Sequence, residues 1–148
     1  MRNHDQYLAT VAVLDGGKLF VAGGWHSRRL QMWDPDENSW TVKADLPAER
    51  DSAASTVVDG RWWIMGGYVD DVESRSVIIY DAENDTWAEG DPLPAPRANF
   101  QATLDHAGSI VLVGAGLPFR RVAGQWVELP TSPVDRLLAP AAGSVVLG

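Results

Sequence analysis

The chain has 148 residues, of which 45% are hydrophobic and 22% charged, a balance typical of a globular protein and not of a disordered one. Its net charge of −8 argues against binding to nucleic acid, and the absence of cysteine excludes a disulfide framework and a thiolate metal site. No stretch reaches the roughly 18 apolar residues that a membrane helix needs, and the first five residues lack the apolar core of a signal peptide.

The compartment is left open by these features, although a chain without cysteine favours a reducing compartment such as the cytoplasm. The content of 7 Trp, 14 Gly and 9 Pro favours short strands joined by tight turns over long helices. We therefore expect an all-β protein.

From the N-terminus onward, short apolar runs closed by a glycine pair recur after a first strand expected at about residues 6–13. They are residues 19–24, residues 62–67, residues 111–115, where Ala115 replaces the second glycine, and residues 145–148 at the end of the sequence. Such self-similarity at a fixed period is the sequence pattern of a repeat architecture.

A second shared block follows each glycine pair. It consists of an aromatic residue, a turn and a Trp seven positions on, at Trp33 and Trp40, Tyr80 and Trp87, and Phe119 and Trp126. A Leu-Pro pair comes next at residues 46–47, 93–94 and 129–130, and then Arg50, Arg97 and Arg136. The Trp residues are 47 and 39 positions apart, within the period of about 40–50 residues found in several repeat families.

Each repeat divides into four strands. In the second copy we expect them at residues 52–58, 62–65, 76–80 and 86–89, with Asp59-Gly60 forming a two-residue hairpin turn. The acidic turn of the first copy, with Asp34, Asp36 and Asn38, resembles the start of a calcium loop. However, Ser39 stands where that loop needs Gly, so we expect a hairpin turn there and no metal site.

These residues resemble the kelch repeat, in which each copy forms one four-stranded blade of a β-propeller. The resemblance covers essentially the whole chain and implies one kelch-type β-propeller segment of four-stranded antiparallel blades. The expected blades are residues 4–47, 48–94 and 95–130, with a partial fourth blade at 131–148. Because propellers typically have about 4–8 blades, we expect an incomplete ring that belongs to a longer propeller or to an assembly.

The resemblance also assigns structural roles to the repeated residues. The glycine pair allows close packing of neighbouring backbone, and Gly114-Ala115-Gly116 lacks the helix that a dinucleotide-binding loop needs. Trp40, Trp87 and Trp126 are expected to lie between adjacent blades.

In kelch propellers the loops between the second and third strands share a face with the connections between blades, and that face commonly binds the partner. Here residues 25–29 form a basic and aromatic loop and residues 68–75 a mainly acidic one, whereas residues 116–118 form a shorter loop. The predicted partner-contacting residues are Trp25, His26, Arg28, Arg29, Arg50, Tyr68, Asp70, Asp71, Glu73, Arg75, Arg97 and Arg136. For the three repeated Arg residues, a structural hydrogen bond to a neighbouring loop is the alternative.

Catalysis has little support in the sequence. The three His residues are scattered, and we find neither an HExxH motif nor a G-x-S-x-G elbow. The kelch fold includes copper-radical oxidases, whose Cys–Tyr cross-link this chain cannot form, and a sialic-acid epimerase. We predict a non-catalytic protein-binding module without cofactor, with a protein or peptide partner or self-association that completes the ring. The alternative is part of a carbohydrate-binding or sugar-modifying kelch enzyme.

Overall fold

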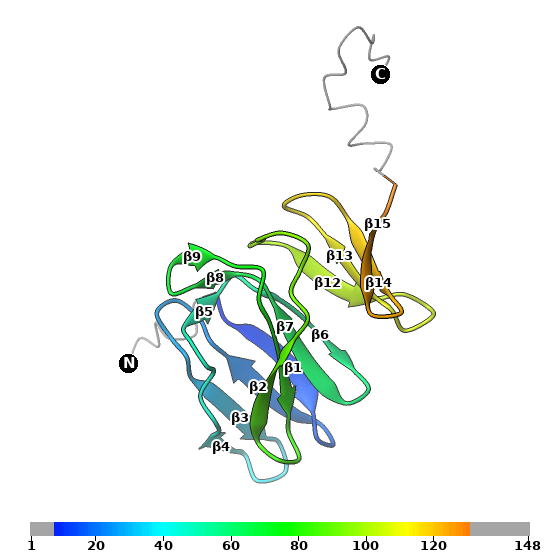
Figure 1. Ribbon diagram of the computed structural model, residues 1–148. Helices are drawn as coiled ribbons and strands as arrows, with labels where there is room; N and C mark the ends of the chain where they lie inside the picture. The colour runs from blue at the N-terminus through cyan, green and yellow to red at the C-terminus, as the bar shows by residue number, and fades with distance from the viewer. Residues whose placement is uncertain (1–7, 131–148) are drawn as a thin grey trace, which may run out of the picture.

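The computed structural model describes residues 8–130, and these form three four-stranded antiparallel sheets that follow one another along the chain (Figure 1). Sheet 1 contains β1 (Thr10–Leu14), β2 (Lys18–Ala22), β3 (Leu30–Asp34) and β4 (Ser39–Val42). Sheet 2 contains β6 (Ala54–Val58), β7 (Arg61–Met65), β10 (Val77–Asp81) and β11 (Thr86–Gly90). Sheet 3 contains β12 (Gln101–Leu104), β13 (Ile110–Val113), β14 (Phe119–Val122) and β15 (Gln125–Glu128).

The all-β prediction and the four-stranded antiparallel blades are thereby confirmed. Within residues 8–130 the sheets do not close into a ring, as expected. The same part of the chain contains no helix long and apolar enough to cross a membrane. The partial fourth blade predicted at residues 131–148 lies outside the described residues.

The hairpin turns follow from local sequence. Asp59 and Gly60 have φ angles of 50° and 75°, which matches the two-residue turn predicted between β6 and β7. Between β3 and β4, the Asp34 carboxylate accepts the peptide N–H of Asp36 at 2.9 Å, which confirms the predicted hairpin turn.

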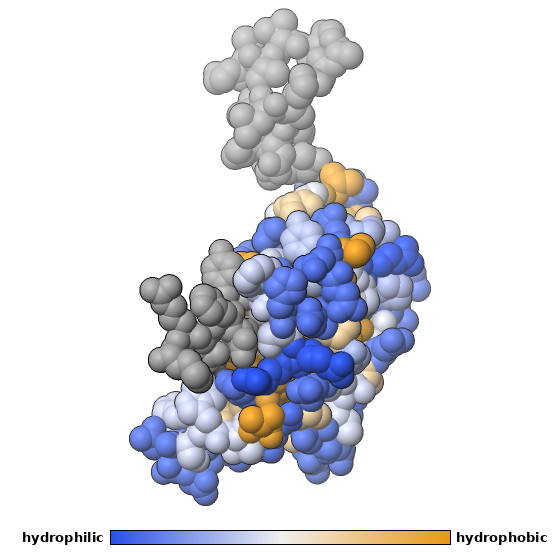
Figure 2. Space-filling model, turned by 90° about the vertical axis from the view of Figure 1, so that its left-hand side faces the viewer, coloured by the Kyte–Doolittle hydropathy of each residue, from blue (hydrophilic) through white to orange (hydrophobic). Residues whose placement is uncertain are grey.

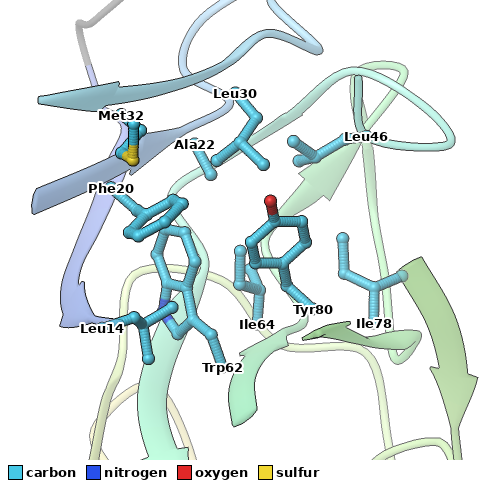
Figure 3. Packing of buried hydrophobic residues seen from close by; sticks show 10 residues of the cluster. All are labelled: Leu14, Phe20, Ala22, Leu30, Met32, Leu46, Trp62, Ile64, Ile78 and Tyr80. Atoms are coloured by element: carbon cyan, nitrogen blue, oxygen red, sulfur yellow. The ribbon is translucent and has the colours of Figure 1, made fainter. Parts of the chain in front are cut away.

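A hydrophobic core lies between sheets 1 and 2 (Figure 3). Because successive strand residues point to opposite faces, Phe20 and Ala22 reach this core from one strand of sheet 1, and Trp62 and Ile64 from one strand of sheet 2. The Phe20 and Tyr80 rings lie 5.7 Å apart across it. The buried members of the cluster are Leu14, Phe20, Ala22, Leu30, Met32, Leu46, Trp62, Ile64, Ile78 and Tyr80.

A second core lies between sheets 2 and 3, built around Met65, Phe100 and Leu112. At its edge the Arg121 guanidinium lies 5.3 Å from the Trp63 ring centroid and 5.4 Å from that of Trp126. A cation held between two aromatic rings therefore joins the sheets at this edge. The strand register pairs Arg121 with Trp126 as it pairs Tyr80 with Trp87, so the sequence-based equivalence of Phe119 with Tyr80 was wrong.

The repeated tryptophans have different environments. The Trp87 indole of sheet 2 packs against the core shared with sheet 1, and its N–H donates to the Ala44 carbonyl at 2.9 Å. Trp126 of sheet 3 packs against the core shared with sheet 2, but its buried indole N–H has no hydrogen-bond partner there. The prediction was wrong for Trp40, which is 54% exposed. The reason is that each of these indoles packs on the preceding sheet, and among residues 8–130 no sheet precedes sheet 1.

The glycine pairs have the close-packing role that was predicted. Gly66 and Gly67 have φ angles of 64° and 83°, and a Cβ at either position would overlap a backbone carbonyl oxygen, of Arg97 and Asp51 respectively. The Gly67 N–H also donates to the Arg97 carbonyl at 2.7 Å. The pair therefore lets the chain that enters the next sheet cross at backbone distance.

A small additional sheet lies beside the main ones. It consists of β5 (Arg50–Asp51), β8 (Tyr68–Val69) and β9 (Val72–Glu73), paired in the order β5-β8-β9. A loop was predicted for residues 68–75, where β8 and β9 form instead. The pairing fastens the long connection of sheet 2 to the segment that leads from sheet 1 into sheet 2.

Candidate functional site

The first loop of the predicted binding face, residues 25–29, is a turn held from within by Ser27. The Ser27 side chain is buried, and its hydroxyl accepts the Arg29 peptide N–H at 3.2 Å. Its carbonyl accepts the Arg50 peptide N–H at 3.2 Å, which ties the turn to the connection that leads into sheet 2. The turn is therefore a fixed structure that projects its longer side chains outward.

Trp25 and His26 project together from this turn. Their ring centroids lie 4.5 Å apart, and both side chains are exposed. The His26 Nδ1 lies 3.5 Å from a carboxylate oxygen of Glu49. An exposed indole supported by a neighbouring ring is a common anchor in protein interfaces.

Beside this pair lies a shallow hollow of about 240 Å³. Its lining residues are His26, Ser27, Arg28, Arg29 and Asp45. The Arg28 Nε lies 3.8 Å from an Asp45 carboxylate oxygen, and both side chains are more than half exposed. An ion pair this long and this exposed contributes little to stability, so an incoming carboxylate can replace Asp45 at low cost.

The second loop, residues 68–75, is a hairpin rather than an irregular loop. Asp70 and Asp71 form its turn with φ angles of 49° and 67°, which suits the twist of the flanking strands. The Asp70 N–H donates to the Glu49 carbonyl at 3.1 Å. Asp70, Asp71, Glu73 and Arg75 are exposed, and Tyr68 is half-buried.

Glu49 joins the two loops, because its side chain lies near His26 and its backbone carbonyl accepts a hydrogen bond from Asp70. The basic first loop and the acidic second loop are therefore parts of one surface, which we call the loop face (residues 25–29, 45–49 and 68–75). The side of the molecule nearest β9 in Figure 1 is turned toward the viewer in Figure 2, where hydrophilic residues predominate around scattered hydrophobic ones.

Two of the predicted contact residues, Arg50 and Arg97, are buried and act inside the fold. Arg50 donates to the Gly66 carbonyl at 2.6 Å and to the Ser76 hydroxyl at 2.8 Å. Burial lowers the pKa of Arg50 to about 10. The Arg97 guanidinium donates to the Leu117 carbonyl, and burial lowers its pKa as well.

Arg97 is also held between the rings of Phe100 and Phe119, at 5.5 Å from each centroid. Each of the two Arg residues therefore fastens the start of its own repeat to that repeat's connection between second and third strands. This is the hydrogen-bonding alternative considered for them, so their side chains do not converge on a common anion site. Arg136 lies outside the described residues.

Sequence reasoning missed Asp45 and Glu49, which lie against the basic loop from the connection between sheets. Both follow the fourth strand of the first repeat, where an acidic residue carries no recognisable motif. The Asp70-Asp71 pair was the available signal for the hairpin, because Asp tolerates the positive φ that both turn positions need.

Comparison with known proteins agrees with this architecture. The family model for the Kelch motif matches residues 8–47 and 49–94. Human Kelch repeat and BTB domain-containing protein 12 is 25% identical over 126 residues, which cover 71% of this chain and 20% of the relative. Human Kelch-like protein 33 is 34% identical over 112 residues, covering 71% of this chain and 21% of the relative.

The chain thus spans about a fifth of the length of the curated relatives it matches. Among solved structures, that of YjhT is similar over 76% of this chain and 35% of that chain, with a TM-score of 0.64 and 20% sequence identity. That likeness supports the fold. With the glycine pairs, the spaced tryptophans and the stacked four-stranded sheets all in place, the chain belongs to the kelch-repeat family.

Proposed function

We propose that the chain is a protein-binding module and that the loop face contacts the partner. The observation that carries the proposal is the junction at Glu49, which holds the Trp25–His26 pair and the Asp70-Asp71 turn on one surface. Fixed polar loops on a rigid β scaffold are a frequent form of binding site. Such loops also lose little conformational entropy on binding.

The charge distribution defines the kind of partner. The exposed Arg28 and Arg29 belong to the first loop, and the exposed Asp70, Asp71 and Glu73 belong to the hairpin. A partner that offers an acidic group to the first loop and a basic group to the hairpin would match both halves. Such complementarity favours orientation and fast association more than raw affinity.

Trp25 provides the apolar part of the contact. It is 49% exposed although its ring is supported by His26, so a partner can cover a large apolar surface without first rearranging the turn. Trp and Arg are the residue types most enriched where interface energy is concentrated. We therefore expect Trp25 and Arg28 to matter more than the rim carboxylates.

The proposal is for binding without catalysis. The rival, a carbohydrate-binding or sugar-modifying kelch enzyme, is expected to need a closed ring with a polar mouth. The hollow beside Arg28 is shallow and formed mainly by charged side chains. This feature favours an extended protein contact over enclosure of a small molecule.

The test is affinity capture from the source cell with a charge-reversal variant and a matched control. Arg28→Glu reverses a charge on the loop face, and Arg61→Glu makes the same change at an exposed position in the β6–β7 hairpin of sheet 2. We expect a partner recovered with the wild type and with Arg61→Glu to be lost with Arg28→Glu. Equal recovery with all three proteins, or a shift in melting temperature caused by simple sugars without any protein partner, would contradict the proposal.

A further inference from the structure

His26 is a titratable side chain within the loop face, and it contacts both a carboxylate and the exposed tryptophan. Its Nδ1 lies 3.5 Å from a carboxylate oxygen of Glu49, and the two side chains are 49% and 41% exposed. Its ring centroid lies 4.5 Å from that of Trp25, with an angle of 57° between the ring planes. A change in the charge of this imidazole therefore acts on both contacts at once.

The backbone on each side of this contact is fixed. His26 has a φ of 55°, a left-handed conformation that few residues other than glycine and asparagine adopt without cost. The turn holds it there, because the Ser27 N–H donates to the Gly24 carbonyl at 3.1 Å and the Ser27 carbonyl accepts the Arg50 N–H at 3.2 Å. Glu49 is held by the hydrogen bond that its carbonyl accepts from the second loop. The imidazole and the carboxylate thus stay close in both charge states of the histidine.

Charges of both signs surround the imidazole of this histidine. Arg28 and Arg29 come from its own turn, and Asp45 lines the same hollow. Glu49 adds a second carboxylate from the connection into sheet 2. The hairpin of the second loop carries further carboxylates, at Asp70, Asp71 and Glu73. Because the two guanidinium groups offset the carboxylates of Asp45 and Glu49, protonation of the imidazole gives the first loop and these two neighbours a net positive charge.

We propose that protonation of His26 strengthens the binding of the partner at the loop face, so that association is tighter at mildly acidic pH than at neutral pH. Histidine is the residue type that ordinarily changes charge between about pH 5 and pH 8. In the protonated ring both nitrogens donate hydrogen bonds, so one N–H can bind Glu49 while the other binds an acidic group of the partner. A cation this close to an indole ring is attracted to it, which holds Trp25 more firmly. This regulation rests on the proposed function, because it acts at the same surface.

The first experiment follows His26 and Trp25 in the free chain by NMR between about pH 8 and pH 5. The Trp25 indole N–H signal is identified by its loss in Trp25→Ala. We expect it to shift together with the ring signals of His26 in the wild type, and to stay constant in His26→Asn, where asparagine tolerates the positive φ. The matched control, which should behave like the wild type, is His106→Asn, because His106 is an exposed histidine in the turn between β12 and β13. An unchanged signal of the buried Trp62 indole shows that each variant folds.

The second experiment is calorimetric titration of a captured, purified partner into the wild type, His26→Asn and His106→Asn at about pH 7.5 and about pH 5.5. The ratio of the dissociation constant at the higher pH to that at the lower pH should be about threefold larger for the wild type and His106→Asn than for His26→Asn, as expected for an exposed ion pair. Titration of the partner's own groups is common to all three proteins, so it cancels in this comparison.

The outcomes separate the pH regulation from the binding role on which it rests. Two results would overturn the regulation alone: a Trp25 signal that does not move as His26 titrates, and equal ratios in all three proteins although Arg28→Glu loses the partner. A partner that Arg28→Glu retains would contradict the binding role of the loop face, and the regulation with it. A ratio that depends on His26, together with loss of the partner in Arg28→Glu, would support both.

Discussion

Trp87 is the side chain whose removal should most clearly reveal how one sheet is fastened to the preceding one. Its indole lies 4.8 Å from the Tyr80 ring and 6.4 Å from the Trp62 ring, centroid to centroid, and its N–H donates to the Ala44 carbonyl. Replacement of a core tryptophan by alanine typically costs about 3–5 kcal/mol. Because Trp87 is only partly buried, we expect Trp87→Ala to lower the free energy of unfolding by about 3 kcal/mol.

A second substitution separates the hydrogen bond from the packing. Trp87→Phe keeps an aromatic ring but removes the indole N–H, so it should cost about 1 kcal/mol for the lost hydrogen bond, with a further small loss of contact. Trp25→Ala is the control, because Trp25 is exposed and contacts the ring of His26 alone among the described aromatic side chains. Its cost should stay below about 1 kcal/mol.

Urea unfolding followed by the fluorescence of the remaining tryptophans gives these values by linear extrapolation. The measurement should be made at one low concentration, at which light scattering shows the same species for every variant, because association shifts apparent stability. If Trp87→Ala cost no more than Trp25→Ala, the idea that the repeated indole fastens each sheet to the preceding one would be refuted.

Three further predictions concern individual contacts. In urea unfolding, Gly66→Ala should lower the free energy of unfolding by at least about 2 kcal/mol more than Gly16→Ala does. Both glycines have a positive φ, but only Gly66 lies against the Arg97 carbonyl. Equal losses of stability in the two variants would contradict this prediction. Asp85→Ala should cost about 2–4 kcal/mol because it leaves a peptide N–H of sheet 1 and a tyrosine hydroxyl without their acceptor, and a cost below 1 kcal/mol would argue against the junction. Backbone N–H donors hold the pKa of Asp105 below its usual 3.8, so this carboxylate stabilises the fold above that pH and ceases to do so as pH falls through its folded pKa. The stability advantage of the wild type over Asp105→Asn should therefore shrink between pH 6 and pH 3 in urea unfolding, and a constant difference would be inconsistent with it.

The sequence was sufficient to predict the sheets because their signals are local and repeated. Gly66-Gly67 and the pairing of Tyr80 with Trp87 each reflect a requirement of one repeat, so copies of the pattern identify the sheets. The seven-residue spacing failed only in sheet 3, where the turn is shorter and Arg121, not Phe119, pairs with Trp126. The two-residue turn at Asp59-Gly60 is similarly local.

The small sheet could not be predicted in this way. Its strands have two residues each, too short for any alternation of polar and apolar residues to be visible. The burial of Arg50 and Arg97 could not be predicted either. The sequence around an Arg is the same whether its guanidinium binds carbonyl groups within the fold or a ligand.

Trp40 shows most clearly what could not be predicted from the sequence. It matches Trp87 in its repeat position and in its cross-strand aromatic partner, yet one is exposed and the other lies in a junction. The difference depends on which sheet packs on the outside of the repeat. No pattern within the repeat carries that information.

The binding role of the loop face is tested most directly by calorimetric titration of a captured, purified partner into wild type, Arg28→Glu and Arg61→Glu. We expect Arg28→Glu to raise the dissociation constant at least about tenfold, a loss of about 1.4 kcal/mol, while Arg61→Glu binds like the wild type. Equal affinity of all three proteins would show that the partner binds elsewhere and would contradict a binding role of the loop face.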